Sequence, residues 1–157
     1  MKSKSNPFSK FEKIIKETIT SLQTKLPSGI FCFISNHSAL DFTSAMPRSP
    51  QPPTGAPVDK YLDRCILAAI EINASVHDGA VIFSFNDQQG VYKVFGWSYR
   101  LYPPFDTRAL LQNRGSAFYS SGSMSLAPGV DAVVSWSGNE IWCHEQGTPR
   151  RLSRETR

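Results

Sequence analysis

The chain has 157 residues, of which 40% are hydrophobic and 19% are charged. This length suits one domain with its own core, and this composition excludes a fibre, a solenoid array and a disordered chain. The net charge is +4, and the excess of lysine and arginine lies mainly at the two ends. We interpret the basic ends as solvated surface. Nucleic-acid binding is not expected, because no recognised reading motif accompanies the charge.

The sequence shows no feature of a membrane or secreted protein. No apolar run approaches the ~20 residues that a membrane helix needs, and the first residues lack the apolar core of a signal peptide. We therefore expect a cytoplasmic protein with no membrane partner. Its three cysteines, Cys32, Cys65 and Cys143, are odd in number and have no zinc-ligand spacing, which predicts buried free thiols.

Two helices and a strand are expected in the first half of the chain. Asn6 and Pro7 favour a helix start, and apolar residues at helical spacing extend this helix over about residues 7–25. A short apolar run at 30–34 predicts a strand covered on both faces. The segment 58–72 has the strongest helical periodicity in the sequence and predicts the second helix.

Between the strand and the second helix, five prolines at 46–57 fix extended backbone and predict a long surface loop. We interpret this loop as a connection more than as a partner-binding segment. The second half alternates buried strands with turns and Gly/Ser-rich stretches. The elements expected there are a hairpin (80–85 and 91–97, with a turn at 86–90), a short helix from Asp106 to Asn113, a small-residue element at 115–125, and a second hairpin (131–136 and 140–144).

This order of helices and strands predicts an α/β fold: a single domain over 1–157 with a mixed β-sheet flanked by helices on both faces. Its core is expected over about 8–147, followed by a basic tail at 148–157. The common enzyme signatures are absent, since the sequence contains no nucleophile elbow, no P-loop and no glycine fingerprint for dinucleotides. The three histidines also lack the spacing of a helical metal site.

One motif stands out against this background. His77 and Asp78 lie on a turn just before a buried strand, and turns at strand ends are where α/β proteins place ligand-binding groups. The alternative is an Asp-Gly turn in which His77 is hydrogen-bonded locally. Both interpretations remain open from these residues alone.

The segment His77 to Ile82, together with the helix before it, resembles the diadenylate cyclase domain, the N-terminal domain of DNA integrity scanning protein DisA. In that family a helix leads into a loop ending His-Asp-Gly-Ala and then into a hydrophobic strand. The segment 115–125 here lies where the family has Gly-Thr-Arg-His-Arg and a small-residue helix. Residues 131–142 resemble the family's Asp-Ala strand, Ser-Glu-Glu turn and returning strand. The resemblance covers about residues 8 to 147, and the His-Asp-Gly-Ala motif is its specific part.

The resemblance implies a diadenylate-cyclase-like fold and a nucleotide site. The family condenses two ATP molecules into cyclic di-AMP, using Mg²⁺ or Mn²⁺ and two domains that meet face to face, which implies a homodimer. Asp78 takes the place of the catalytic carboxylate and metal ligand, and Ser116 takes the threonine position beside the phosphates. The residues that the resemblance assigns to nucleotide binding are His77, Gly79, Ala80, Gly115, Ser116, Phe118, Tyr119 and Ser135.

The departures from the family concern charge. The family's Arg-His-Arg falls on residues 117–119, which are Ala, Phe and Tyr, and its Ser-Glu-Glu falls on 135–137, which are Ser, Trp and Ser. Losing one phosphate-facing arginine costs on the order of 10³ to 10⁵ in the rate of phosphoryl transfer. We therefore expect very low or absent cyclase activity.

Two functions follow as hypotheses. The first is a catalytically degenerate diadenylate-cyclase-like domain that binds a nucleotide or cyclic dinucleotide as a sensor, or acts as an interaction module with a protein partner. Its aromatic residues would then stack on a base, although the same residues can equally refill the emptied site as core. The alternative is an active, divergent diadenylate cyclase that uses ATP with Mg²⁺ or Mn²⁺. The aromatic residues considered are Phe118, Tyr119, Trp97, Tyr99 and Trp136.

Overall fold

The computed structural model describes residues 6–104 and 116–152. Within these residues no helix is both long and apolar enough to cross a membrane. The elements, in chain order, are η1 (Pro7–Phe11), α1 (Glu12–Leu22), β1 (Ser28–Ile34), η2 (His37–Phe42), β2 (Thr43–Ala45), α2 (Leu62–Ile72), η3 (Ala74–His77), β3 (Ala80–Asn86), β4 (Val91–Leu101), α3 (Ser116–Met124), β5 (Val130–Ser137), β6 (Glu140–Glu145) and β7 (Thr148–Arg151).

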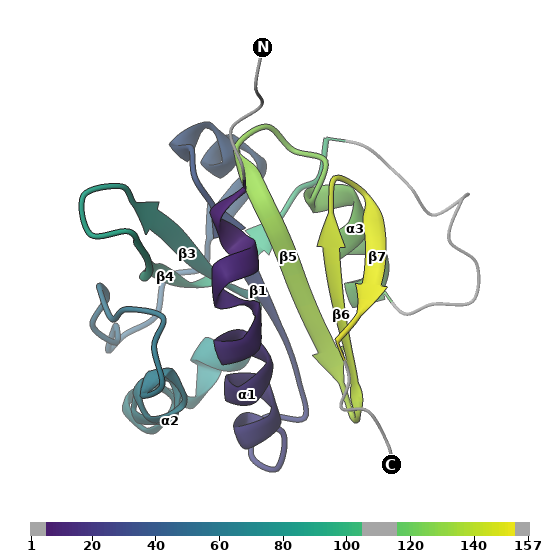
Figure 1. The fold of residues 1–157 in the computed structure, drawn as a ribbon. Coiled ribbons are helices and arrows are strands. Elements are labelled where there is room, and N and C mark those ends of the chain that lie inside the picture. The colour runs from purple at the N-terminus through teal and green to yellow at the C-terminus, as the bar shows by residue number, and fades with distance from the viewer. Residues whose placement is uncertain (1–5, 105–115, 153–157) are drawn as a thin grey trace.

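One sheet of seven strands forms the centre of the structure, in the order β2-β4-β3-β1-β5-β6-β7 (Figure 1). β1 and β3 run parallel, and the other described neighbours are antiparallel. A parallel pair needs a long crossover, and here α2 lies in the crossover between β1 and β3. The prediction of a mixed sheet in an α/β fold is confirmed.

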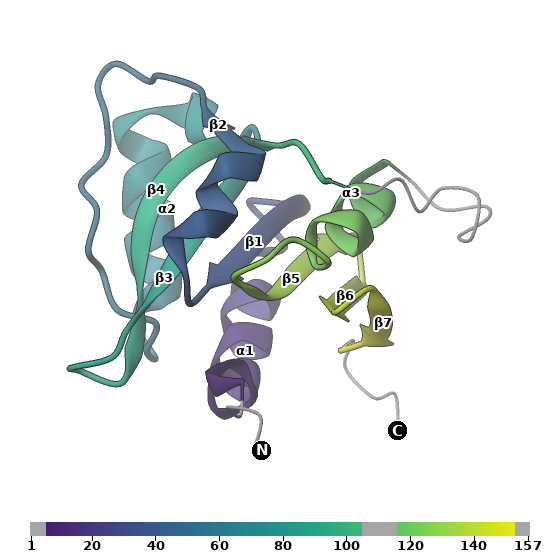
Figure 2. The same ribbon diagram turned by 90° about the horizontal axis from the view of Figure 1, so that it is seen from above.

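Helices cover both faces of this sheet, as predicted (Figures 1 and 2). On one face, α1 and α2 pack over an aromatic cluster in which the rings of Phe33 and Phe83 stack at 4.8 Å. On the other face, η2 and α3 cover a smaller cluster that includes Cys32, Ile82 and Met124. Side chains alternate between the two faces along each strand, so neighbouring residues of one strand belong to different clusters.

Both predicted helices of the first half are present but shorter than expected. The first begins as the 3₁₀ turn η1, and α1 ends at Leu22. The second begins at Leu62 and not at Val58, because the residues before it pair with β4. The amide of Val58 donates to the carbonyl of Tyr92, and that of Gly55 donates to the carbonyl of Val94.

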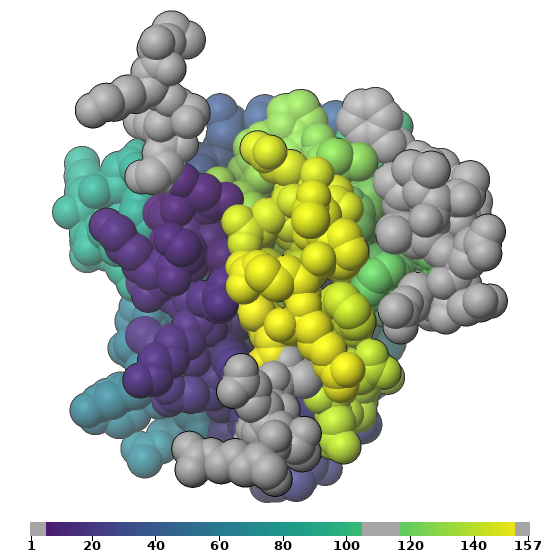
Figure 3. Space-filling view, turned by 45° about the vertical axis from the view of Figure 1, so that its right-hand side comes forward, coloured from purple at the N-terminus to yellow at the C-terminus, as the bar shows by residue number. Residues whose placement is uncertain are grey.

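The C-terminal residues correct the expected basic tail. Residues 148–151 form β7 on the edge of the sheet, and their positive charge is partly compensated there. Arg150 Nη2 lies 2.6 Å from Glu12 Oε1 and 2.7 Å from Glu145 Oε1. The C-terminal strands therefore lie directly beside the N-terminal helix (Figure 3). The short elements η2 and β2 were also not predicted, and the helix expected over 106–113 lies outside the described residues.

The three cysteines are free thiols, as predicted. Cys32 and Cys143 are buried, whereas Cys65 on α2 is partly exposed. Burial raises the pKa of the Cys32 thiol to about 12, because the apolar surroundings disfavour the thiolate. Cys32 is therefore a packing residue and not a reactive one.

Candidate functional site

The strand register brings one row of residues together across the sheet. Ala80 at the start of β3 lies opposite Ile30 on β1 and Tyr99 on β4. Ile30 in turn lies opposite Ser135 on β5, and Ser135 lies opposite Trp142 on β6. Directly opposed residues share a face of the sheet, and this face carries α3 and η2. We call these five residues the cross-sheet row.

The His-Asp-Gly-Ala turn forms one end of the site beside this row. His77 ends η3, and Asp78 and Gly79 lead directly into β3. Gly79 has a φ of +80°, and a Cβ added there would lie 2.8 Å from the backbone oxygen of Tyr99 and 2.7 Å from Cε of Met46. Glycine is therefore required at this position, both for its backbone conformation and for the close approach of β4.

Two basic side chains face the carboxylate of Asp78. Nη2 of Arg48 lies 3.7 Å from Oδ2, and Nε2 of His77 lies 3.5 Å from Oδ1. The other ring nitrogen of His77, Nδ1, is 2.6 Å from the carbonyl oxygen of Ala74. This is the local hydrogen bond that the turn interpretation predicted, and it fixes the ring beside Asp78. Because 62% of the Asp78 side chain is exposed, its ion pair with Arg48 contributes little to stability.

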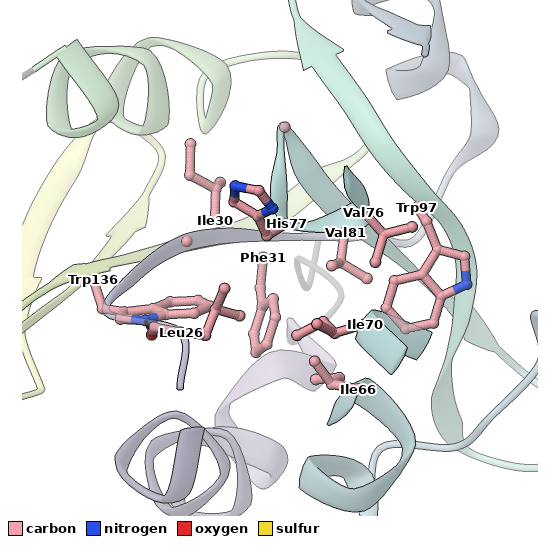
Figure 4. A pocket seen from close by; sticks show the side chains of 12 residues that line it. Leu26, Ile30, Phe31, Ile66, Ile70, Val76, His77, Val81, Trp97 and Trp136 are labelled. Carbon is pink, nitrogen blue, oxygen red and sulfur yellow. Dashed lines mark hydrogen bonds between the residues drawn. The ribbon is translucent and has the colours of Figure 1, made fainter. Parts of the chain in front are cut away.

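Two of the five aromatic residues considered for base stacking lie on the opposite face of the sheet. Figure 4 shows Trp97 and Trp136 on the side of β1 that faces α1 and α2, whereas Ile30 and His77 lie on the other side. The indole N–H of Trp136 donates to the carbonyl of Leu26 at 2.9 Å. Both tryptophans are 2% exposed. The structure thus corrects the stacking hypothesis for these two residues.

A narrow apolar crevice runs between these tryptophans and reaches His77 and Gly79 at one end (Figure 4). Its cavity volume is about 10 Å³, roughly the space of one water molecule. It is too small for a nucleobase. This crevice therefore gives a base no room on the α1 and α2 side of the turn.

Phe118 also belongs to the core. It is 8% exposed and packs edge-on against Trp142 at 5.3 Å and against His144 at 4.6 Å. This packing favours the alternative that Phe118 is a core residue, and its assignment to ligand binding stays a prediction. Tyr119, its neighbour on α3, is partly exposed. Trp142 was missed, because its place in the row depends on the pairing of β5 with β6.

The remaining residues that the resemblance assigns to nucleotide binding are Ser135, Ser116 and Gly115. Ser135 is buried inside β5, two residues before the strand ends at Ser137. It lies in the strand that the sequence predicted over 131–136, and it belongs to the cross-sheet row. Ser116 begins α3, and nothing is described of its side chain. Gly115 lies outside the described residues.

The described residues do not fit a resident divalent metal at Asp78. Mg²⁺ takes oxygen ligands and is commonly held by one or two carboxylates together with substrate phosphates. The one carboxylate at the turn, that of Asp78, already faces the guanidinium of Arg48.

Comparisons with known proteins add the fold class. No protein-family model matches the sequence, and no curated protein shows significant sequence similarity to it. The structure of the diadenylate cyclase DacA from Staphylococcus aureus, in a double-mutant form, superposes with a TM-score of 0.58 at 16% identity and covers 94% of this chain and 89% of that one. A hypothetical membrane spanning protein from Bacillus cereus superposes with a TM-score of 0.64 at 13% identity, over 90% of this chain and 63% of that one. This chain has a diadenylate-cyclase-like fold.

Proposed function

We propose that this protein binds an adenine nucleotide or a cyclic dinucleotide at the cross-sheet row and does not condense ATP. One observation supports it most strongly: the ring of Tyr99 lies on the row beside the His-Asp-Gly-Ala turn, whereas residues 117–119 carry no charge. Such a site can hold a base, but it lacks the family's phosphate-facing cations on α3. The domain would then report the presence of its ligand without consuming it.

The position of Tyr99 suits base stacking. A Cβ added at Gly96 would lie 2.4 Å from Cε1 of Tyr99, so the ring rests on bare backbone. Phe95 supports it with a ring contact at 6.3 Å. Ala80 and Ile30 continue the same face as an apolar floor. A fixed aromatic ring contributes about 1–3 kcal/mol per stacked base.

The loss of catalysis follows from charge. Phosphoryl transfer depends on cations that are already in place around the phosphates. Here the first turns of α3 present Ala117, a buried Phe118 and Tyr119. The alternative, an active and divergent diadenylate cyclase, is supported by the retained His-Asp-Gly-Ala motif and by the fold similarity to DacA. Release of cyclic di-AMP from ATP would favour this alternative.

Removing the stacking ring is expected to weaken nucleotide binding. Tyr99→Ala should reduce the affinity for ATP about 5- to 100-fold in isothermal titration, because one stacking contact is lost. Tyr61→Ala is the matched control, since Tyr61 is equally aromatic, 50% exposed and located at the start of α2 on the other face. If the Tyr99→Ala variant binds ATP as tightly as the wild type, the ring of Tyr99 does not contact the ligand. If the wild type binds neither ATP nor cyclic di-AMP, the proposed function is wrong.

Restoring cations on α3 is expected to strengthen binding. The double variant Ala117→Arg with Tyr119→Arg should raise ATP affinity about tenfold or more, because each charged hydrogen bond to phosphate contributes about 1.5–3 kcal/mol. The affinity for adenosine should not increase, since adenosine has no phosphate. Gln88→Arg with Gln89→Arg adds the same charge on the exposed turn after β3 and serves as the control. An equal gain in both double variants would mean that α3 does not face the phosphates.

A further inference from the structure

Arg48 reaches the His-Asp-Gly-Ala turn from the Pro-rich loop 46–57. Its Nη2 lies 3.7 Å from Oδ2 of Asp78, and its Nε donates to Oγ of Ser98 at 3.2 Å. Only 19% of the Arg48 side chain is exposed, compared with 62% for Asp78. The guanidinium is therefore packed against the protein, while the carboxylate projects toward solvent.

The loop that carries Arg48 is anchored on both sides of it. The amide of Met46 donates to the carbonyl of Ser98 at 2.8 Å, and the indole N–H of Trp97 donates to the carbonyl of Pro53 at 3.0 Å. Nε of Arg100 also contacts the sulfur of Met46 at 3.2 Å. The loop is thus more than a connection: it holds Arg48 in place, so little side-chain entropy remains to be lost when a ligand binds.

Ser98 provides a second observation at the same place. It is fully buried and has a φ of +60°, a conformation that residues other than glycine rarely adopt. Such backbone strain costs of order 1–3 kcal/mol and persists where the surroundings require it. Here it lets one residue bind Met46 through its carbonyl and Arg48 through its hydroxyl.

We propose that Arg48 is a phosphate-binding residue of the nucleotide site and replaces the divalent cation beside Asp78. This inference rests on the proposed function. Nε is occupied by Ser98 and Nη2 faces Asp78, whereas Nη1 makes no hydrogen bond or ion pair with any residue in the described ranges. A guanidinium presents its donors in a planar fork that suits phosphate oxygens. Nη1 can therefore bind a phosphate while the bond to Ser98 is kept.

The contact with Arg48 reverses the role that the resemblance implied for Asp78. If Asp78 held a metal ion, loss of its charge would weaken nucleotide binding. Beside Arg48, its negative charge instead competes with the phosphate for the same guanidinium and repels it. Neutralising Asp78 should consequently strengthen binding, and it should do so when no metal is present.

The test is isothermal titration of ATP into the full chain, in EDTA and in Mg²⁺, with three variants. The wild type should bind ATP with similar affinity in both buffers. Arg48→Gln should lose about tenfold or more, because a charged hydrogen bond to phosphate is removed, and Asp78→Asn should gain severalfold in EDTA. Arg64→Gln, on α2 beside Tyr61, should match the wild type.

The possible failures are distinguishable. Binding that requires Mg²⁺ and is lost in Asp78→Asn overturns the role of Arg48 but leaves a nucleotide site. If a folded Arg48→Gln variant binds ATP with unchanged affinity, the proposed role of Arg48 is also wrong. Thermal melting establishes that the variant is folded. The exposed Asp78→Asn substitution tests the same contact if Arg48→Gln fails to fold. Absence of ATP binding by the wild type in both buffers contradicts the proposed function itself.

Discussion

Gly79→Ala is expected to lower the free energy of unfolding by about 2–4 kcal/mol, since strain and overpacking act together. The residue has a φ of +80°, and the new Cβ would lie 2.8 Å from the backbone oxygen of Tyr99 and 3.1 Å from the carbonyl carbon of Ser98. Backbone atoms of a paired strand cannot move aside as a side chain can. The turn and β4 would have to separate, which would also disturb the cross-sheet row.

Gly90→Ala is the matched control for this variant. Gly90 has a φ of +66°, but an added Cβ meets no atom within 4 Å. It therefore reports the cost of the backbone conformation alone, about 1–2 kcal/mol. Urea unfolding of both variants measures the difference. If Gly79→Ala and Gly90→Ala lose equal stability, the Cβ added at position 79 does not clash with the backbone of β4.

Acidification from pH 7 to pH 4 is expected to remove about 3 kcal/mol of stability through His144 alone. This side chain is fully buried beneath Phe118, and neither ring nitrogen has a hydrogen-bond partner among the described residues. Burial lowers the pKa of His144 from 6.5 to about 4, because the charged imidazolium is poorly solvated there. One pKa unit corresponds to about 1.4 kcal/mol.

The direction of this effect follows from proton binding. Above pH 6.5 the imidazole is neutral in both the folded and the unfolded chain, so it contributes no pH dependence. Between pH 6.5 and pH 4 the unfolded chain binds a proton that the folded chain does not, so stability falls. Below pH 4 both states are protonated, and the loss of stability through His144 levels off.

His144→Leu should remove this part of the acid sensitivity in urea titrations across the same pH range, whereas His37→Gln, at an exposed histidine, should retain it. If acidification lowers the stability of the His144→Leu variant as much as that of the wild type, protonation of the buried imidazole is not the cause of the acid sensitivity.

The fold could be predicted largely because its signals are local. Apolar strand segments separated by turn residues predict the two hairpins, and Asp78 with Gly79 predicts the turn at which Gly79 adopts a positive φ. Pairing between distant strands carries no such local signal. The strand β7 was therefore missed: Arg150 looks like tail charge until Glu12 and Glu145 lie beside it.

The site could be predicted only in part, for the same reason. His77 and Asp78 form a motif in the sequence, but Arg48, which contacts Asp78, lies thirty residues before it in the chain. No sequence pattern indicates that contact. Trp136 and Ser135 are adjacent, yet one faces α1 and the other faces the candidate site, because side chains alternate along β5. A shift of one residue in the register decides which of them a ligand meets.

The fold alone does not decide between a sensor and a cyclase, since related folds host different functions. The distinction depends on charge at the site. Residues 117–119 supply none, and the described carboxylate of Asp78 is paired with a guanidinium. Both observations support the proposal that the domain binds a nucleotide without condensing ATP.

The most direct test is native mass spectrometry of the purified chain after incubation with ATP and Mn²⁺, with small-molecule analysis of the same sample. We predict protein that carries intact ATP and no cyclic di-AMP above a protein-free control. Cyclic di-AMP that forms with the wild type and disappears with Asp78→Asn would contradict this account and identify the chain as an active diadenylate cyclase.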